Sequence, residues 1–91
     1  MQINVEAANA QARQARMTAS RLRDINTFLR SYQADLHQAW SGQEMIAINN
    51  AISDIMGRIS RTAVDLESAG SSIANSAQAL RRADELAARS N

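Results

Sequence analysis

The chain has 91 residues, a formal net charge of +1, and neither cysteine nor proline. This length suits one small domain, and the lack of cysteine excludes disulfides and thiolate metal sites. A nearly neutral charge gives no reason to expect a nucleic-acid partner. No apolar run approaches the roughly 20 residues of a membrane span, and the start, "MQINVEAANA", lacks the pattern of a secretory signal peptide. These features favour one all-α domain over residues 1–91, because proline would break long helices.

A first helix is predicted over about residues 5–40. Small or apolar side chains recur there at steps of three or four residues, which puts them on one helical face. This stripe comprises Ala8, Ala12, Ala15, Ala19, Leu22, Ile25, Leu29, Leu36 and Trp40. A second apolar patch gathers away from the stripe, and we predict that it is a dimer interface rather than a set of scattered surface hydrophobes. Its residues are Met17, Ile25, Phe28 and Tyr32.

The stretch "QAWSGQEMI" predicts a chain reversal at residues 40–42. Ser41 and Glu44 match the S-x-x-E capping box, in which the serine caps a helix and the glutamate reaches back to it. Trp40 and Met45 then occupy the two positions of a hydrophobic staple. Gly42 allows a tight turn where a side chain would crowd the opposite helix. The alternative is one continuous helix with Trp40 on its surface.

A second helix is predicted over about residues 43–88. Apolar residues recur every seven positions in one row. A second row lies three positions after the first, and a third row lies one position after the second. Three positions per heptad describe a helix in a bundle, so we predict an antiparallel hairpin that pairs into a four-helix bundle dimer. Gly70 lies on this stripe and predicts close approach of a neighbouring backbone. The rows are Met45, Ile52, Ile59, Leu66, Ile73, Leu80, Ala87; then Ile48, Ile55, Thr62, Ala69, Ser76, Ala83; then Met56, Ala63, Gly70, Ala77.

The sequence offers no set of residues for catalysis, and we expect no catalytic, metal or cofactor site. His37 is the only histidine, and Asp35 two residues away falls on another helical face. No glycine-rich phosphate loop is present. The basic residues are all arginine, and those in the first helix (Arg13, Arg16, Arg21 and Arg23) spread over about 160°. We therefore interpret them as a solvated surface and expect neither nucleic-acid nor membrane binding.

Trp40-Ser41-Gly42 between two long amphipathic helices resembles the WXG family of small type VII (ESX) secretion substrates, over roughly residues 3–88. The resemblance also rests on "ISRTAVDLESAGSSIANSAQALRRADEL". It implies a helical hairpin that dimerises, with itself or with a related WXG-like chain. It further implies export in the folded state, without a cleaved signal peptide, by a machine driven by a secretion ATPase.

In that family a C-terminal signal pairs an aromatic or apolar residue with an acid four residues later. The matching positions here are Leu80 and Asp84, with Ala87 as the next apolar position. The tyrosine usual in the signal is missing. Leu80 and Asp84 have an alternative interpretation as a core residue and a solvent-facing residue of the second helix. Some relatives escort larger toxins, which adds a co-secreted toxin to the implied partners.

Two other functions fit a helical hairpin. One is a filament subunit, such as those of type III secretion needles, although those hairpins commonly carry a proline in the turn and "WSGQ" has none. The other is a membrane-active helix pair. Oligomeric state separates the first from a secretion substrate, and vesicle leakage tests the second.

Overall fold

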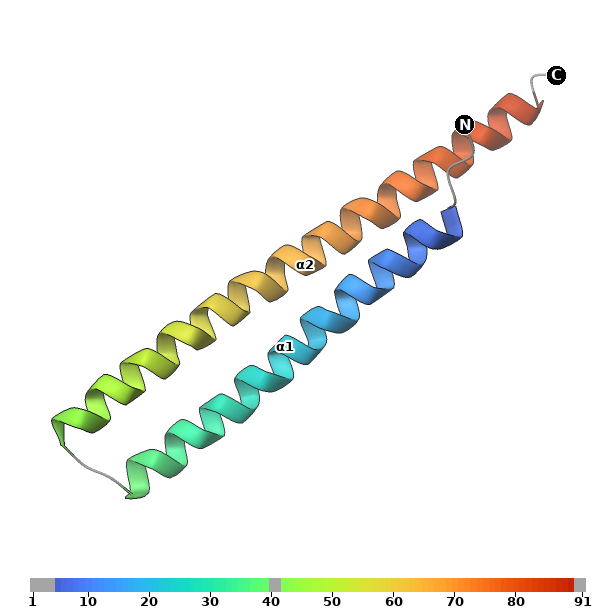
Figure 1. Ribbon diagram of the computed structural model, residues 1–91. Helices are drawn as coiled ribbons and strands as arrows, with labels where there is room; N and C mark the ends of the chain where they lie inside the picture. Colours follow the sequence, from blue (N-terminus) through green and yellow to red (C-terminus); the bar gives the residue numbers. More distant parts are fainter. Residues whose placement is uncertain (1–4, 40–41, 90–91) are drawn as a thin grey trace.

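The computed structural model describes residues 5–39 and 42–89 as two helices joined by one reversal of the chain. Helix α1 spans Val5–Ala39 and helix α2 spans Gln43–Arg89. They lie side by side and antiparallel (Figure 1), so the predicted all-α hairpin is confirmed. Neither helix is long and apolar enough to cross a membrane. Trp40 and Ser41 lie outside the described residues, so the predicted cap and staple stay predictions.

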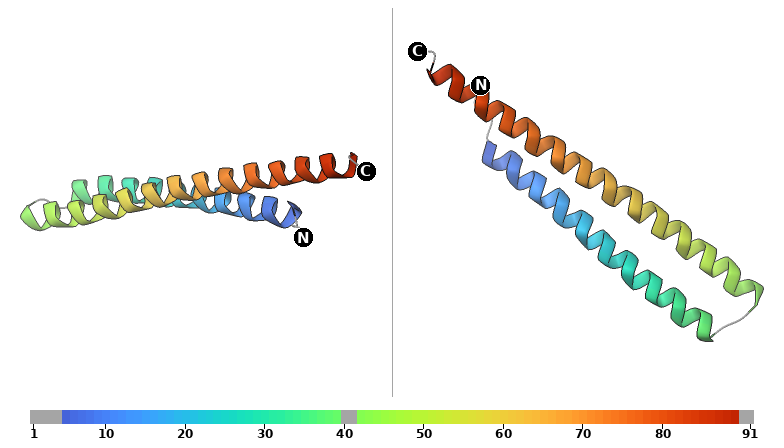
Figure 2. Two further views of the ribbon diagram at one scale, coloured as in Figure 1. Left: turned by 90° about the horizontal axis from the view of Figure 1, so that it is seen from above. Right: turned by 180° about the vertical axis from the view of Figure 1, so that it is seen from behind.

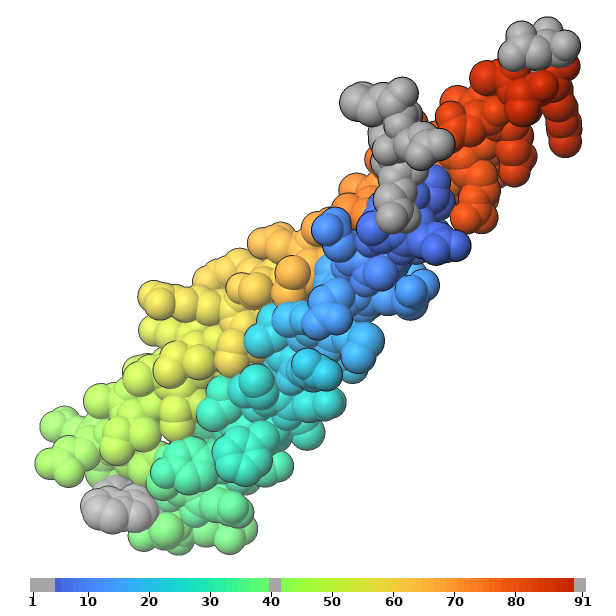
Figure 3. Space-filling model, turned by 45° about the vertical axis from the view of Figure 1, so that its right-hand side comes forward, coloured from blue at the N-terminus to red at the C-terminus, as the bar shows by residue number. Residues whose placement is uncertain are grey.

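The molecule is a rod measuring 75 × 14 × 14 Å. Helix α2 has 47 residues against 35 in α1, and its C-terminal end extends beyond the start of α1 (Figure 2). The space-filling view shows the two helices in contact along α1, with the end of α2 clear of it (Figure 3). Two helices cover only one flank of each other, so most of the rod's surface faces solvent.

Small side chains form the contact between the helices. Ala19 and Ala63 have no exposed surface, and Ala12 and Ala77 are almost as buried. No large side chain among the described residues is completely buried. A Cβ atom built on Gly70 would lie 3.0 Å from the backbone oxygen of Ala12, which confirms the close approach predicted at this glycine.

Helix α2 buries two of its three predicted apolar rows. Two rows face α1: the row that begins at Met45 and the row that contains Ala63 and Gly70. The remaining row runs from Ile48 to Ala83 in steps of seven, and all of its residues are exposed. The predicted stripe of three positions per heptad is that of a helix in a bundle, and within one hairpin only two of the three rows are covered. The physical reason is that α2 meets one helix instead of two or three, and one neighbour covers a stripe only two positions wide.

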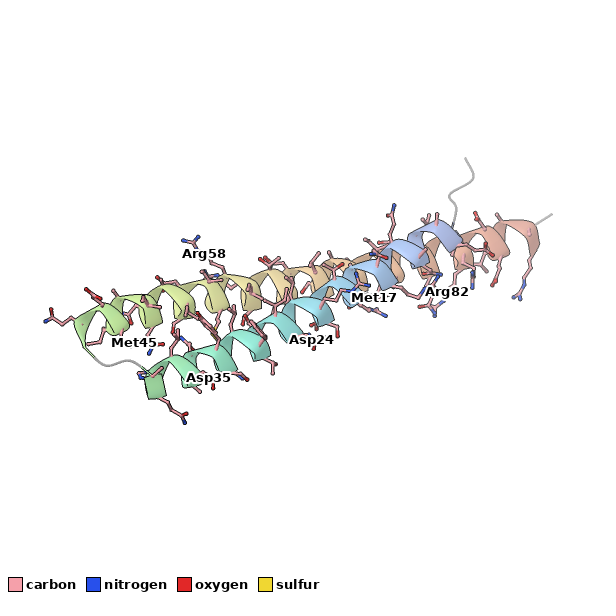
Figure 4. All side chains as sticks on the ribbon, turned by 60° about the horizontal axis from the view of Figure 1, so that its bottom comes forward. Met17, Asp24, Asp35, Met45, Arg58 and Arg82 are labelled. Carbon is pink, nitrogen blue, oxygen red and sulfur yellow. The ribbon has the colours of Figure 1, made fainter. Side chains whose placement is uncertain are left out.

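The start of α2 is fixed by Gly42 and Met45. The carbonyl of Gly42 accepts a hydrogen bond from the Ile46 amide at 3.4 Å. The backbone φ angle of Gly42 is 120°, which residues with a side chain rarely adopt. Met45 is 5% exposed and lies on the side of α2 that faces α1 (Figure 4). Glu44 is exposed beside it. The buried methionine therefore packs the two helices together next to the turn.

Candidate interaction faces

One long edge of the contact between the helices is polar. Asn26 donates from Nδ2 to the Met56 carbonyl at 3.1 Å and to Ser60 Oγ at 2.8 Å. Along the same edge Arg23 forms an ion pair with Glu67. Arg30 and Ser60 meet at a cavity on this edge. We call this edge the arginine seam.

Gln33 repeats the arrangement of Asn26 one heptad later. Its Nε2 donates to the Asn49 carbonyl at 3.2 Å and to Ser53 Oγ at 3.0 Å. The Asn49 side chain contacts His37 Nε2. Seven residues forward on α1 thus correspond to seven residues backward on α2, as an antiparallel register requires.

The opposite edge of the hairpin is apolar. On α1, Ile25 and Tyr32 flank the buried stripe on the side away from Arg23 and Arg30, by helical geometry. On α2, Ile48 and Ile55 likewise flank the buried stripe on the side away from Ser53 and Ser60. Because those arginines and serines lie along one edge, the four apolar side chains share the other edge. With Phe28, they form what we call the apolar face.

The apolar face is strongly exposed. Phe28 is 69% exposed, and the other four residues (Ile25, Tyr32, Ile48 and Ile55) are between 46% and 49% exposed. Met17 is exposed too, but it lies eleven residues, or about 16 Å, before Phe28 on the outer side of α1. Three of the four predicted interface residues thus lie together, and Met17 lies apart from them.

Ile48 and Ile55 were not expected on this face, because the sequence pattern placed them in the core. The spacing of seven shared by Ile25 and Tyr32, and by Ile48 and Ile55, is the signal that finds both flanks. Ile25 itself was assigned to the buried stripe as well as to the patch. It is 46% exposed, because the stripe of α1 that faces α2 is also two positions wide.

The far end of the same edge is hollowed. A shallow groove of about 320 Å³ lies between the start of α1 and the second half of α2. It belongs to the apolar edge because Ser76 continues the row of Ile48 and Ile55 in steps of seven. The groove is lined by Ala8, Ser72, Ile73, Ser76, Ala77 and Leu80. One edge of the rod therefore has a bulky half near the turn and a recessed half near the termini.

The three residues matched to an export signal differ in their surroundings. Leu80 is half-buried and lines the groove, whereas Asp84 and Ala87 are exposed near the C-terminal end of α2. The structure therefore gives Leu80 a packing role and leaves Asp84 accessible to a partner.

The described residues contain no group of three or more histidine, cysteine or acidic side chains that could hold a metal ion. The cavities lie along the surface of the rod, where water has free access. What the arrangement offers is two long faces of different chemistry, which suits binding to other macromolecules.

The fold defines a class, the elongated antiparallel two-helix hairpin. A solved structure of this class, Geobacillus thermodenitrificans EsxA in crystal form I, superposes on the chain with a TM-score of 0.87 at 23% sequence identity. The match covers 96% of this chain and 97% of EsxA. The resemblance to the WXG family, to which the Esx name belongs, is thus confirmed at the level of the fold. No protein-family model and no curated protein matches the sequence.

Proposed function

We propose that the protein is a type VII secretion substrate that dimerises, is exported folded, and acts through binding rather than catalysis. The observation that carries this proposal is the superposition on EsxA over almost the whole of both chains. The Trp-Ser-Gly tripeptide between two long helices supports it independently. Export places the protein outside the cell, and the partners are the secretion ATPase and, where the chain acts as an escort, a co-secreted toxin.

Dimerisation follows from the burial in a single hairpin. Its most buried residues in the described part of the chain are four alanines, Gly70, Met45 and Asn26, and two helices with so small a core are marginal in water. Burying the apolar face removes the exposed parts of five large side chains from water. Four of them are about half exposed, so each of these contributes about half of the roughly 1.5–3 kcal/mol for full burial. A second copy or a related WXG-like hairpin would complete a four-helix bundle across this face.

The shape of the apolar edge favours an antiparallel dimer. A twofold axis perpendicular to the rod would place the bulky half of one copy, with Phe28 and Tyr32, against the recessed groove of the other. Self-complementary packing of this kind fits a twofold interface. A parallel pair would press bulky half against bulky half and leave both grooves uncovered.

The interface is tested with Phe28→Glu. Since Phe28 is the most exposed residue of the apolar face, this variant should keep its helicity but sediment as a monomer. Val64→Glu is the matched control, because Val64 is 54% exposed and lies outside the apolar face. A wild-type monomer, or a Phe28→Glu variant that dimerises as well as wild type, would remove this interface. A wild-type polymer would favour the filament hypothesis.

The orientation is tested by cross-linking, which is straightforward because the chain has no cysteine. Mixing Tyr32→Cys protein with Ser76→Cys protein should give a disulfide between the two variants under mild oxidation. Tyr32→Cys protein alone should give little cross-linked dimer. A high yield of cross-linked dimer from Tyr32→Cys protein alone, with little from the mixture, would establish a parallel pair.

Export is tested with Asp84→Ala in a strain that carries a type VII machine. The variant should fold and dimerise normally, since Asp84 is exposed near the C-terminal end of α2, yet remain in the cells. Glu85→Ala removes the adjacent exposed acid and serves as the control. Normal export of Asp84→Ala would assign the residue to the solvated surface.

A further inference from the structure

The arginine seam differs in chemistry from the apolar face and lies on the opposite edge of the hairpin. Arg16, Arg23 and Arg30 lie seven residues apart along α1, which spaces them by about 10 Å on one edge of the helix. Contacts with α2 confirm the alignment at both ends of this row. A Cβ atom built on Gly70 would lie 3.4 Å from Cγ of Arg16, and Arg30 lines a cavity with Ser60.

Positive charge dominates this edge. Glu67 is engaged with Arg23, and the structure shows no ion pair for Arg16 or Arg30 among the described residues. Asp24 and Asp35 belong to other sides of α1, since neither lies three, four or seven residues from Arg16, Arg23 or Arg30. A row of arginines of this kind is suited to a ligand with several negative charges.

The cavity between Arg23 and Arg30 is built from polar groups. It measures about 270 Å³ and is lined by these two arginines with Asn26, Thr27 and Ser60. Asn26 is 8% exposed, and while its Nδ2 is satisfied by α2, its Oδ1 is buried with no hydrogen-bond partner. Asn26 is therefore held in place by α2, and the arginines and hydroxyl groups around it are what the cavity presents to a ligand.

We propose that the arginine seam binds an acidic peptide segment of a partner protein. An acidic peptide brings carboxylates, which form bidentate, charge-assisted hydrogen bonds with the guanidinium groups of Arg30 and Arg16. Nucleic acid fits less well, because the chain as a whole carries a net charge of only +1. An acidic helix of a second copy fits poorly, because no two of the chain's nine acidic residues are seven apart. The seam lies opposite the apolar face and stays accessible in the proposed dimer.

The test is fluorescence anisotropy with a labelled oligoglutamate peptide at low ionic strength. Wild-type protein binds the peptide, and Arg30→Gln weakens binding about tenfold, as expected for loss of one charge-assisted pair. Arg16→Gln should weaken it in the same direction. Arg58→Gln is the control, because Arg58 points away from α1 (Figure 4), and it should change affinity by less than about twofold. Circular dichroism confirms that each variant is folded.

Three results would overturn the proposal. The first is no peptide binding by wild-type protein. The second is equal weakening by Arg58→Gln and Arg30→Gln, which would mean attraction by overall charge. The third is displacement of the peptide by inorganic phosphate or duplex DNA at matched charge concentration, which would assign the seam to phosphates. None of these results bears on export or dimerisation, because the seam and the apolar face share no residue.

Discussion

The two halves of the hairpin are held together by different means. In the half near the termini, Ala12, Ala19, Ala63 and Gly70 bring the helix backbones close together. In the half near the turn, the contact contains polar side chains of α1 that donate to carbonyls and hydroxyls of α2. Close approach of the backbones adds dispersion contacts. It does little to fix the register of the two helices, because a shift by seven residues would again place small side chains against each other.

The polar half supplies that information. Asn26 and Gln33 each donate to a carbonyl and a serine hydroxyl, and both pairs fit only when α1 and α2 are aligned as observed. Buried polar side chains at core positions of helical bundles fix register in this way, at some cost in stability. One half of the rod therefore sets the distance between the helices, and the other half sets their alignment.

Overpacking the small-residue half should produce the largest effect. Ala63→Leu inserts three heavy atoms at a site with no exposed surface, so the helices must separate, and we expect a loss of about 2–3 kcal/mol of unfolding free energy. Denaturation in urea at fixed protein concentration measures it. Ala47→Leu, at an exposed position of α2 on the same side as Arg58, should change the value by less than about 0.5 kcal/mol. Equal effects would mean that the helices do not approach closely at Ala63.

Removing the polar contacts should cost less and should affect alignment. Asn26→Ala deletes two hydrogen bonds across the helices, and we expect a loss of about 1–2 kcal/mol in the same assay. Asn50→Ala, at an exposed position of α2, is the control. A stability unchanged by Asn26→Ala would show that the side chain contributes no net stabilisation.

Much of this architecture could be predicted from the sequence, because the spacing of apolar residues and a glycine near the midpoint fix two helices and a reversal. The row of seven that starts at Met45 predicted the face of α2 that meets α1. The width of the buried stripe could not be predicted in the same way. Ile48 and Ile55 look like core residues in any bundle, and only the number of neighbouring helices decides whether they are covered.

The candidate sites show the same limit. Phe28 and Tyr32 were recognised as a patch because they lie off the main stripe of α1. The arginine seam was missed, because Arg13, Arg16, Arg21 and Arg23 considered together spread around the helix. Its row becomes visible once Arg30 is included and once α2 shows which edge carries Ser60 and Glu67. Helical angles within α1 alone do not reveal which residues of α2 lie opposite.

Glycine substitutions test whether the small-residue half sets the distance between the helices, and they have the smallest expected effects. A Cβ atom built on Gly57 would have no neighbouring atom within 4 Å, so Gly57→Ala should stabilise the protein by up to about 1 kcal/mol through helix propensity alone. At Gly70 the same gain in helix propensity is opposed by a steric contact. A Cβ atom there would lie 3.0 Å from the Ala12 carbonyl oxygen, a backbone atom that cannot rotate away. Thermal unfolding should therefore show a higher Tm for Gly57→Ala and an unchanged or lower Tm for Gly70→Ala. Equal stabilisation of both variants would mean that the helices separate at Gly70 without cost, and that the small-residue half does not set their distance.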